Sequence, residues 1–159
     1  MRLTHLADYA VVILTAAASR SAGERPSASA LATETALPLP TTQKLLGKLA
    51  QAGLLHATRG AGGGVMLARP ASAITLADII EAVEGPIAMT QCSGSHEASD
   101  CALDAHCRVK PHMTIVSRTV RGALAAVTLD QLCSPAQAGA QCLPAREDHR
   151  TSALAGAQG

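Results

Sequence analysis

The stretch Leu37-Pro-Leu-Pro-Thr-Thr-Gln-Lys-Leu-Leu-Gly-Lys-Leu-Ala-Gln-Ala-Gly53 combines a proline-rich turn with an amphipathic helix. Proline is tolerated in the first helical turn, so we expect the helix to begin near Leu39 and run to Ala52, with Gly53 in a C-cap position. Its two sides, separated at about 100° per residue, differ in character. One side carries Thr42, Leu45, Leu46 and Leu49, and the other carries Gln43, Lys44, Gly47, Lys48 and Gln51. The apolar side should dock on other helices and leave the polar side open.

Two further helices are predicted before this stretch. Residues 3–19 carry apolar side chains at helical spacing, and Ser27 can cap a short helix that ends near Thr35. Two helices joined by a tight turn, the second one two-sided, fit a helix-turn-helix whose second helix reads DNA. The competing interpretation is an ordinary solvated helix face. The DNA-binding candidates on the second helix are Thr41, Gln43, Lys44, Lys48 and Gln51.

A β-hairpin is predicted directly after the helix-turn-helix. Residues 54–58 and 65–67 are strand candidates, and the loop between them reads Arg59-Gly-Ala-Gly-Gly-Gly64. A hairpin in this position is the wing of a winged helix. Arg59 at its tip could enter a minor groove, where the electrostatic potential favours arginine. The loop is not a dinucleotide-binding fingerprint, because a strand follows it instead of a helix.

The second half of the chain begins with a predicted helix over residues 75–84, which Thr75 and Asp78 should cap. The longest predicted helix runs from Pro111 to Val127. Its apolar stripe has nothing left to cover within a compact winged helix, so a second subunit is the expected partner. The alternative is that the stripe packs on its own domain. The stripe consists of Met113, Val116, Val120, Ala123 or Leu124, and Val127.

These elements predict a mainly α fold with a small β-hairpin wing, a winged helix-turn-helix followed by a long C-terminal dimerisation helix. The predicted organisation is a DNA-binding domain over residues 1–85 and a cysteine-containing loop over 86–110. A dimerisation helix over 111–132 and a disordered tail over 133–159 complete it. The tail is rich in alanine and glycine and lacks periodicity.

Charge and composition narrow the function classes. Residues 1–70 carry seven Lys/Arg against three acids, and residues 71–159 carry six against nine, so the first part is the basic, DNA-facing one. The chain contains no apolar run long enough to span a membrane and no signal peptide, which predicts a cytoplasmic protein with reduced thiols. The five cysteines are an odd number, which argues against a full disulfide framework.

The segment from residue 92 to residue 107 holds Cys92, Cys101 and Cys107 among glycine, serine and acidic residues. The segment has too little apolar surface to hold one conformation by itself, so something else must order it. Three thiolates favour a soft metal or an iron–sulfur cluster in this role. A zinc-stabilised interaction module is the second hypothesis, although zinc thiols usually come in tighter pairs. A thiol enzyme is the third. The absence of C-x-x-C and of a nucleophile–base pair predicts that the chain is not an enzyme.

Four sequence features together resemble the Rrf-type winged-helix regulators, whose members include IscR, NsrR and RirA. They are Met1-Arg-Leu-Thr4 with Asp8-Tyr-Ala10, Ala52-Gly-Leu54 leading to Thr58-Arg-Gly-Ala-Gly-Gly-Gly64, Ala82-Val-Glu-Gly-Pro86, and the three cysteines. The resemblance covers residue 1 to about residue 132. The segments 8–12 and 84–88 are most similar to the regulators of the SUF iron–sulfur assembly genes.

The resemblance implies a homodimer crossed by its long helices, with recognition helices over residues 39–52 in the major grooves of operator DNA and Arg59 in the minor groove. It also implies a 2Fe-2S or 4Fe-4S cluster on Cys92, Cys101 and Cys107. IscR-like members have a histidine three residues after the third cysteine, where this chain has Lys110. The NsrR-like pattern places Asp8 of the partner chain as fourth ligand. His112 and an external ligand are the alternatives.

The expected function is therefore transcriptional regulation through an iron–sulfur cluster, and the resemblance implies SUF or iron homeostasis genes as its targets. A nitric-oxide-responsive repressor is the alternative within the same family, because nitrosylation destroys such clusters. The expected partners are double-stranded DNA and a second copy of the chain, without a membrane. Cys133 and Cys142 have no assigned role.

Overall fold

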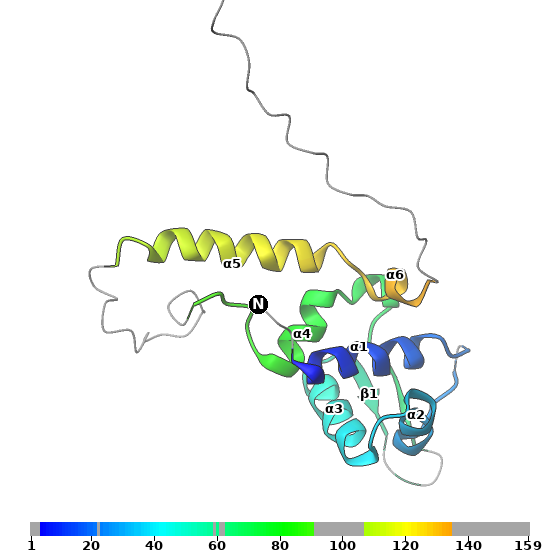
Figure 1. The fold of residues 1–159 in the computed structure, drawn as a ribbon. Coiled ribbons are helices and arrows are strands. Elements are labelled where there is room, and N and C mark those ends of the chain that lie inside the picture. The colour runs from blue at the N-terminus through cyan, green and yellow to red at the C-terminus, as the bar shows by residue number, and fades with distance from the viewer. Residues whose placement is uncertain (1–3, 22, 59, 61–62, 91–106, 135–159) are drawn as a thin grey trace, which may run out of the picture.

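A computed structural model describes residues 4–21, 23–58, 60, 63–90 and 107–134 of this chain. It confirms a mainly helical fold with one small antiparallel hairpin (Figure 1). The elements are α1 His5–Ala18, α2 Ala28–Thr35, α3 Leu39–Gln51, β1 Leu55–Ala57, β2 Val65–Leu67, the short 3-10 helix η1 Ala71–Ala73, α4 Leu76–Glu84, α5 Lys110–Ala125 and α6 Leu129–Cys133. The predicted tail beyond residue 134 lies outside the described residues.

Helices α2 and α3 form the helix-turn-helix. The Ser27 hydroxyl accepts a hydrogen bond from the Ala30 N–H and so caps α2, as the sequence predicts. Ala36 ends α2 in the left-handed conformation, which turns the chain sharply toward α3. The four residues on the predicted apolar side of α3 are all buried, namely Thr42, Leu45, Leu46 and Leu49. The amphipathic interpretation of α3 is therefore confirmed.

The hairpin pairs β1 with β2 in the register Leu55↔Leu67, His56↔Met66 and Ala57↔Val65. It is anchored to the segment that precedes α2, because the Val65 N–H donates to the Pro26 carbonyl at 3.0 Å. Gly64 permits this approach. A Cβ at residue 64 would lie 2.3 Å from the Arg25 carbonyl oxygen, which is backbone and cannot rotate away.

Helix α6 returns the end of the described chain to the main domain. The Leu129 N–H donates to the Ile74 carbonyl at 2.8 Å, and the Leu76 N–H donates to the Val127 carbonyl at 2.8 Å. Leu129 is fully buried in the main core, which also contains residues of α1, α2, α3 and the hairpin. These bonds fix the end of α5 beside α4.

A second, smaller core lies between α1, α4 and α5, and it corrects the predicted role of the α5 stripe. Val120, Leu124 and Ala125 pack in it against Ala7 and Ile80 of the same chain. The sequence favoured a partner subunit for the whole stripe and left packing on its own domain as the alternative, and Val120 and Leu124 of the C-terminal half follow that alternative, because they are partly buried within the chain. The reason is the anchorage of α6, which holds this half on α4.

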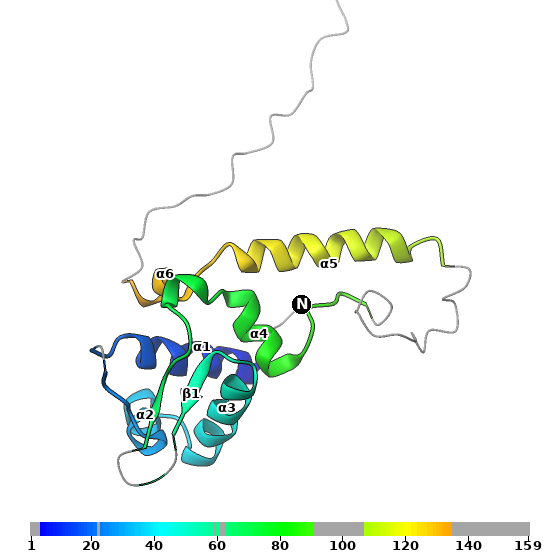
Figure 2. The same cartoon turned by 180° about the vertical axis from the view of Figure 1, so that it is seen from behind.

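The first half of α5 extends beyond the body formed by α1 to α4, as Figures 1 and 2 show from opposite sides. Large apolar side chains are exposed here: the N-cap residue Val109 is 56% exposed, Ile115 52% and Val116 41%. Among the described helices, none is long and apolar enough to cross a membrane.

Candidate nucleic-acid interface and cysteine segment

The open edge of α3 is polar. Gln43, Lys44, Gly47 and Gln51 are exposed along it, and Thr41 is half-buried at its beginning. This edge adjoins a hollow of about 310 Å³, which Gln43 and Gly47 share with Ser27 of the α2 cap and with Thr58 and Gly64 of the hairpin. The helix edge and the hairpin loop thus meet on one surface.

Lys48 does not belong to this edge, although the sequence placed it there. Its side chain is half-buried, and Nζ donates a hydrogen bond of 2.6 Å to the Val83 carbonyl in the last turn of α4. The position of a residue on a helix does not show which carbonyls a neighbouring helix presents. A long lysine side chain can follow the apolar surface to reach such a partner.

Backbone hydrogen bonds join described residues within the glycine-rich loop of the hairpin. The Thr58 N–H donates to the Gly64 carbonyl at 2.9 Å, and the Gly63 N–H donates to the Gly60 carbonyl at 2.8 Å. Gly60 has φ of +106°, a conformation that L side chains rarely adopt. The wing residue Arg59 lies outside the described residues.

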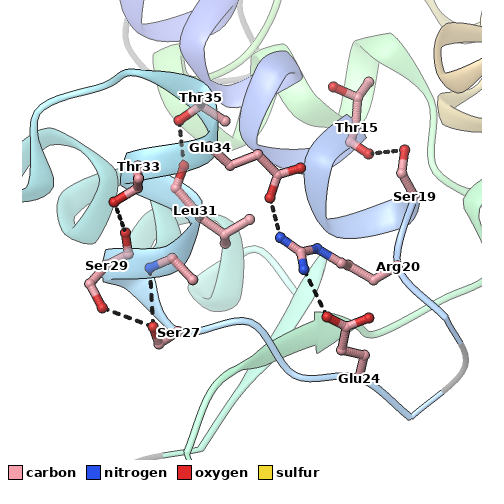
Figure 3. A network of polar contacts seen from close by, with 11 residues as sticks. Thr15, Ser19, Arg20, Glu24, Ser27, Ser29, Leu31, Thr33, Glu34 and Thr35 are labelled. Atoms are coloured by element: carbon pink, nitrogen blue, oxygen red, sulfur yellow. Dashed lines mark hydrogen bonds and ion pairs between the residues drawn. The ribbon is translucent and has the colours of Figure 1, made fainter.

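A polar network at the end of α1 fixes the beginning of the helix-turn-helix (Figure 3). The Arg20 guanidinium donates to Glu24 at 2.7 Å and also to Glu34 of α2. Hydrogen bonds with Glu24 and Glu34 raise the pKa of Arg20 above its already high value. Both carboxylates are partly exposed, so the network is mainly a geometric link between α1, the linker and α2.

The last turn of α4 joins α1. The backbone N–H and the hydroxyl of Thr4 both donate to Glu84 Oε1, at 2.9 and 2.8 Å. Thr4 occupies the N-cap position of α1, but its side chain binds Glu84 and makes no cap bond. Residues 80 positions apart carry no local signal of such a pair.

The segment that follows α4, residues 85–89, contacts α5. Gly85 turns it with φ of +91°, and Ile87 is buried in the smaller core. The Met89 N–H then donates to Ser117 Oγ at 3.0 Å. Nearby, the Arg121 guanidinium binds both oxygens of Glu81, at 2.9 and 3.0 Å. These contacts fix the described approach to the cysteine segment.

The candidate ligands are only partly described. Cys92 and Cys101 lie outside the described residues, whereas Cys107 is half-buried just before α5. Asp8 is exposed on α1, and His112 is exposed in the first turn of α5. Within the described ranges, no group of three or more His, Cys, Asp and Glu side chains could hold a metal ion. The described residues therefore supply donors without forming a complete site.

Cys133 differs from these cysteines. It packs against the main core, and its Sγ lies 3.9 Å from the Thr15 carbonyl, to which it donates. Burial, and then the nearby Asp130 carboxylate, raises the pKa of the Cys133 thiol. A thiol with a raised pKa is more often protonated, and the protonated form is a poor nucleophile and metal ligand.

The Rrf2 family model, described as iron-dependent transcriptional regulator, matches residues 3–135. An HTH-type transcriptional regulator of Neisseria meningitidis is 33% identical over 132 residues, which cover 83% of this chain and 87% of the relative. The regulator IscR of Cereibacter sphaeroides is 42% identical over 86 residues, or 53% of this chain and 56% of that protein.

Solved structures are similar as well. CymR of B. subtilis, called the global cysteine regulator, has a TM-score of 0.63 and 27% identity, over 84% of this chain and 97% of that one. T. potens IscR has a TM-score of 0.59 and 25% identity, over 83% of this chain and 85% of that one. The similarity thus includes regulators named for different roles.

Proposed function

This chain belongs to the Rrf2 family of transcriptional regulators, and on that premise we propose that it binds operator DNA as a homodimer under the control of an iron–sulfur cluster. The cluster ligands are Cys92, Cys101 and Cys107, with Asp8 of the partner subunit completing the set. The protein acts in the cytoplasm, where thiols stay reduced.

The observation that carries the DNA-binding part is the exposed polar edge of α3 beside the hairpin loop. Gln43 has an amide that can bind an adenine edge with two hydrogen bonds, and this contact distinguishes bases. Lys44 contacts a phosphate and contributes affinity for any sequence. Thr41 and Gln51 flank these two, and Arg59 extends from the wing into the minor groove.

The dimer is supported by the apolar residues at the beginning of α5. Val109, Ile115 and Val116 are large side chains of which about half remains exposed within the described part of the chain. Neighbouring exposed apolar residues on one helix indicate a protein interface. A second copy of α5 crossing the first covers them, and a two-fold dimer presents two reading helices to successive half-sites.

The donor set fits a cluster. Three thiolates select soft metals and iron–sulfur clusters, and Cys107 stands four residues before the Pro111 of α5. When bound, the cluster would supply iron and sulfide that can be oxidised or lost, so that its presence can act as a signal. Ligation by Cys92 and Cys107 links the chain that leaves α4 to the beginning of α5. A carboxylate such as Asp8 is a hard ligand, which exchanges readily on a soft cluster.

The regulated genes in this proposal are those of SUF iron–sulfur assembly or iron homeostasis. Nitric oxide is the alternative signal, since it destroys clusters. The similarity to a protein named as a cysteine regulator favours testing a second alternative, in which the fold acts without a cluster. A zinc-bound cysteine segment is the remaining alternative.

Anaerobic purification followed by absorption spectroscopy and iron, sulfide and zinc analysis tests the proposal. We expect a coloured protein with iron and sulfide, and we expect Cys92→Ser, Cys101→Ser or Cys107→Ser to abolish both. Cys133→Ser is the matched control and should retain the cluster. A colourless wild type with stoichiometric zinc, or with no metal, would refute cluster sensing.

The fourth ligand is tested by reconstituting Asp8→Ala and His112→Ala protein anaerobically. Loss of the true ligand should change the circular dichroism of the cluster and shorten its lifetime in air. An Asp8→Ala cluster with unchanged spectrum and lifetime would remove Asp8 from the ligand set and leave the three cysteines as ligands.

A further inference from the structure

Lys48 lies in the last turn of the reading helix but binds a different helix. Its Nζ donates a hydrogen bond of 2.6 Å to the Val83 carbonyl. That carbonyl is among the last four of α4, which have no partner within the helix. The C-terminal end of a helix carries partial negative charge, so an ammonium group there is a favourable, charge-assisted partner.

The same turn of α4 connects to two other parts of the molecule. Glu84, next to Val83, binds Thr4 at the beginning of α1, the helix that also carries Asp8. Gly85 follows and leads the chain to Met89, whose N–H is held by Ser117 of α5. Three elements therefore meet at this turn: the reading helix, the first helix and the approach to the cysteine segment.

Lys48 is the polar link between the reading helix and this junction. Leu49 of α3 and Val83 of α4 are also buried in the main core, where apolar side chains pack without directional bonds. Apolar packing is non-directional, whereas the short charge-assisted hydrogen bond ties the Lys48 ammonium to one particular carbonyl of α4. Displacement of the last α4 turn would consequently displace α3.

We infer that Lys48 is a positioning residue that couples the last turn of α4 to the reading helix, and that it does not contact DNA phosphate. The inference rests on the proposed function, because the junction leads into the proposed cluster ligands. It assigns Lys48 a role distinct from that of Lys44, which lies one turn earlier on the same helix and is exposed.

The test compares Lys48→Met with Lys44→Met in the full-length protein. Each change removes one positive charge from α3 and keeps a long apolar stem. Operator affinity is measured by fluorescence anisotropy as a function of salt, with cluster-loaded and cluster-free protein. Lys44→Met should lower the salt slope by about one unit, as the loss of one phosphate contact does.

Lys48→Met should instead keep the wild-type salt slope while operator affinity of the loaded protein changes at least about fivefold, toward that of the cluster-free protein. The ratio between loaded and cluster-free affinities should approach one, whereas Lys44→Met should keep the wild-type ratio. Lys48→Arg, which retains charge and donors, should restore the ratio. A Lys48→Met slope that falls like that of Lys44→Met, or an unchanged ratio, would overturn the inference.

A second measurement uses only wild-type protein and does not depend on the folding of a variant. Acetylation of lysine amines is followed by mass spectrometry with and without operator DNA. DNA should protect Lys44 and leave the slow reaction of Lys48 unchanged. DNA protection of Lys48 equal to that of Lys44 would also overturn the inference. A wild type that binds no DNA at all would refute the proposed function instead.

Discussion

Gly47→Ala should change stability and DNA binding in opposite directions. Gly47 lies inside α3, and a Cβ at this residue would meet no heavy atom within 4 Å. Alanine is favoured over glycine in a helix interior by about 0.8–1.0 kcal/mol, so the variant should be more stable by about that amount. For a domain of this size the melting temperature should rise by about 3–5 °C.

Binding should weaken because the same open space is the proposed approach to DNA. Gly47 lies between Gln43 and Gln51 on the exposed edge of α3 and lines the hollow beside the hairpin. An added methyl group in a closely packed contact costs about 1–3 kcal/mol, which corresponds to a fivefold to 150-fold loss of affinity.

Thermal unfolding by circular dichroism and operator binding by fluorescence anisotropy measure the two effects. Gly122→Ala is the matched control for stability, because a Cβ there also meets nothing within 4 Å. Gly122 lies on α5, which is separate from the exposed polar edge of α3. The dimer content of the Gly122→Ala protein is checked by sedimentation. Wild-type operator affinity in Gly47→Ala protein that shows the expected rise in melting temperature would refute the close approach of α3 to DNA.

Four further predictions concern the hairpin, the two halves of α5 and Cys133. Gly64→Ala places a Cβ 2.3 Å from the Arg25 carbonyl oxygen, so calorimetry should show a loss of about 1–3 kcal/mol in stability; an unchanged melt would contradict the tight anchorage of the hairpin. Val116→Asp should leave the monomer folded and abolish the dimer in sedimentation, because Val116 is exposed within its own chain; a dimeric variant would refute this interface. Val120→Asp should instead lower the melting temperature, since Val120 packs in the smaller core. Cys133 should react with iodoacetamide only slowly at neutral pH and faster as pH rises toward its raised pKa; rapid neutral alkylation would contradict its burial.

The local structure of the domain was predictable because its signals lie within a few residues. Thr75 and Asp78 form the predicted capping box, and Ser27 caps α2 as its position suggests. The buried side of α3 follows from helical spacing alone. The polar edge, including Gln43 and Lys44, follows from the same spacing.

Long-range contacts were not predictable in the same way. Nothing in the local sequence marks Lys48 as the partner of a carbonyl 35 residues later, or Thr4 as the partner of Glu84. Val116 is exposed, whereas Val120 on the same stripe packs in the smaller core. This difference also depends on α6, because the burial of Leu129 holds the end of α5 beside α4. A helical repeat shows which residues share a face but does not show what covers each part of it.

The most direct test of the account measures operator affinity of one anaerobic preparation before and after its cluster is removed by chelation. We expect the loaded and cluster-free forms to differ in affinity by about fivefold to 150-fold, the usual range of coupling between two sites. The difference should be absent in Cys107→Ser protein and present in Cys133→Ser protein. Equal operator affinities for the loaded and cluster-free wild type would contradict control of DNA binding by the cluster.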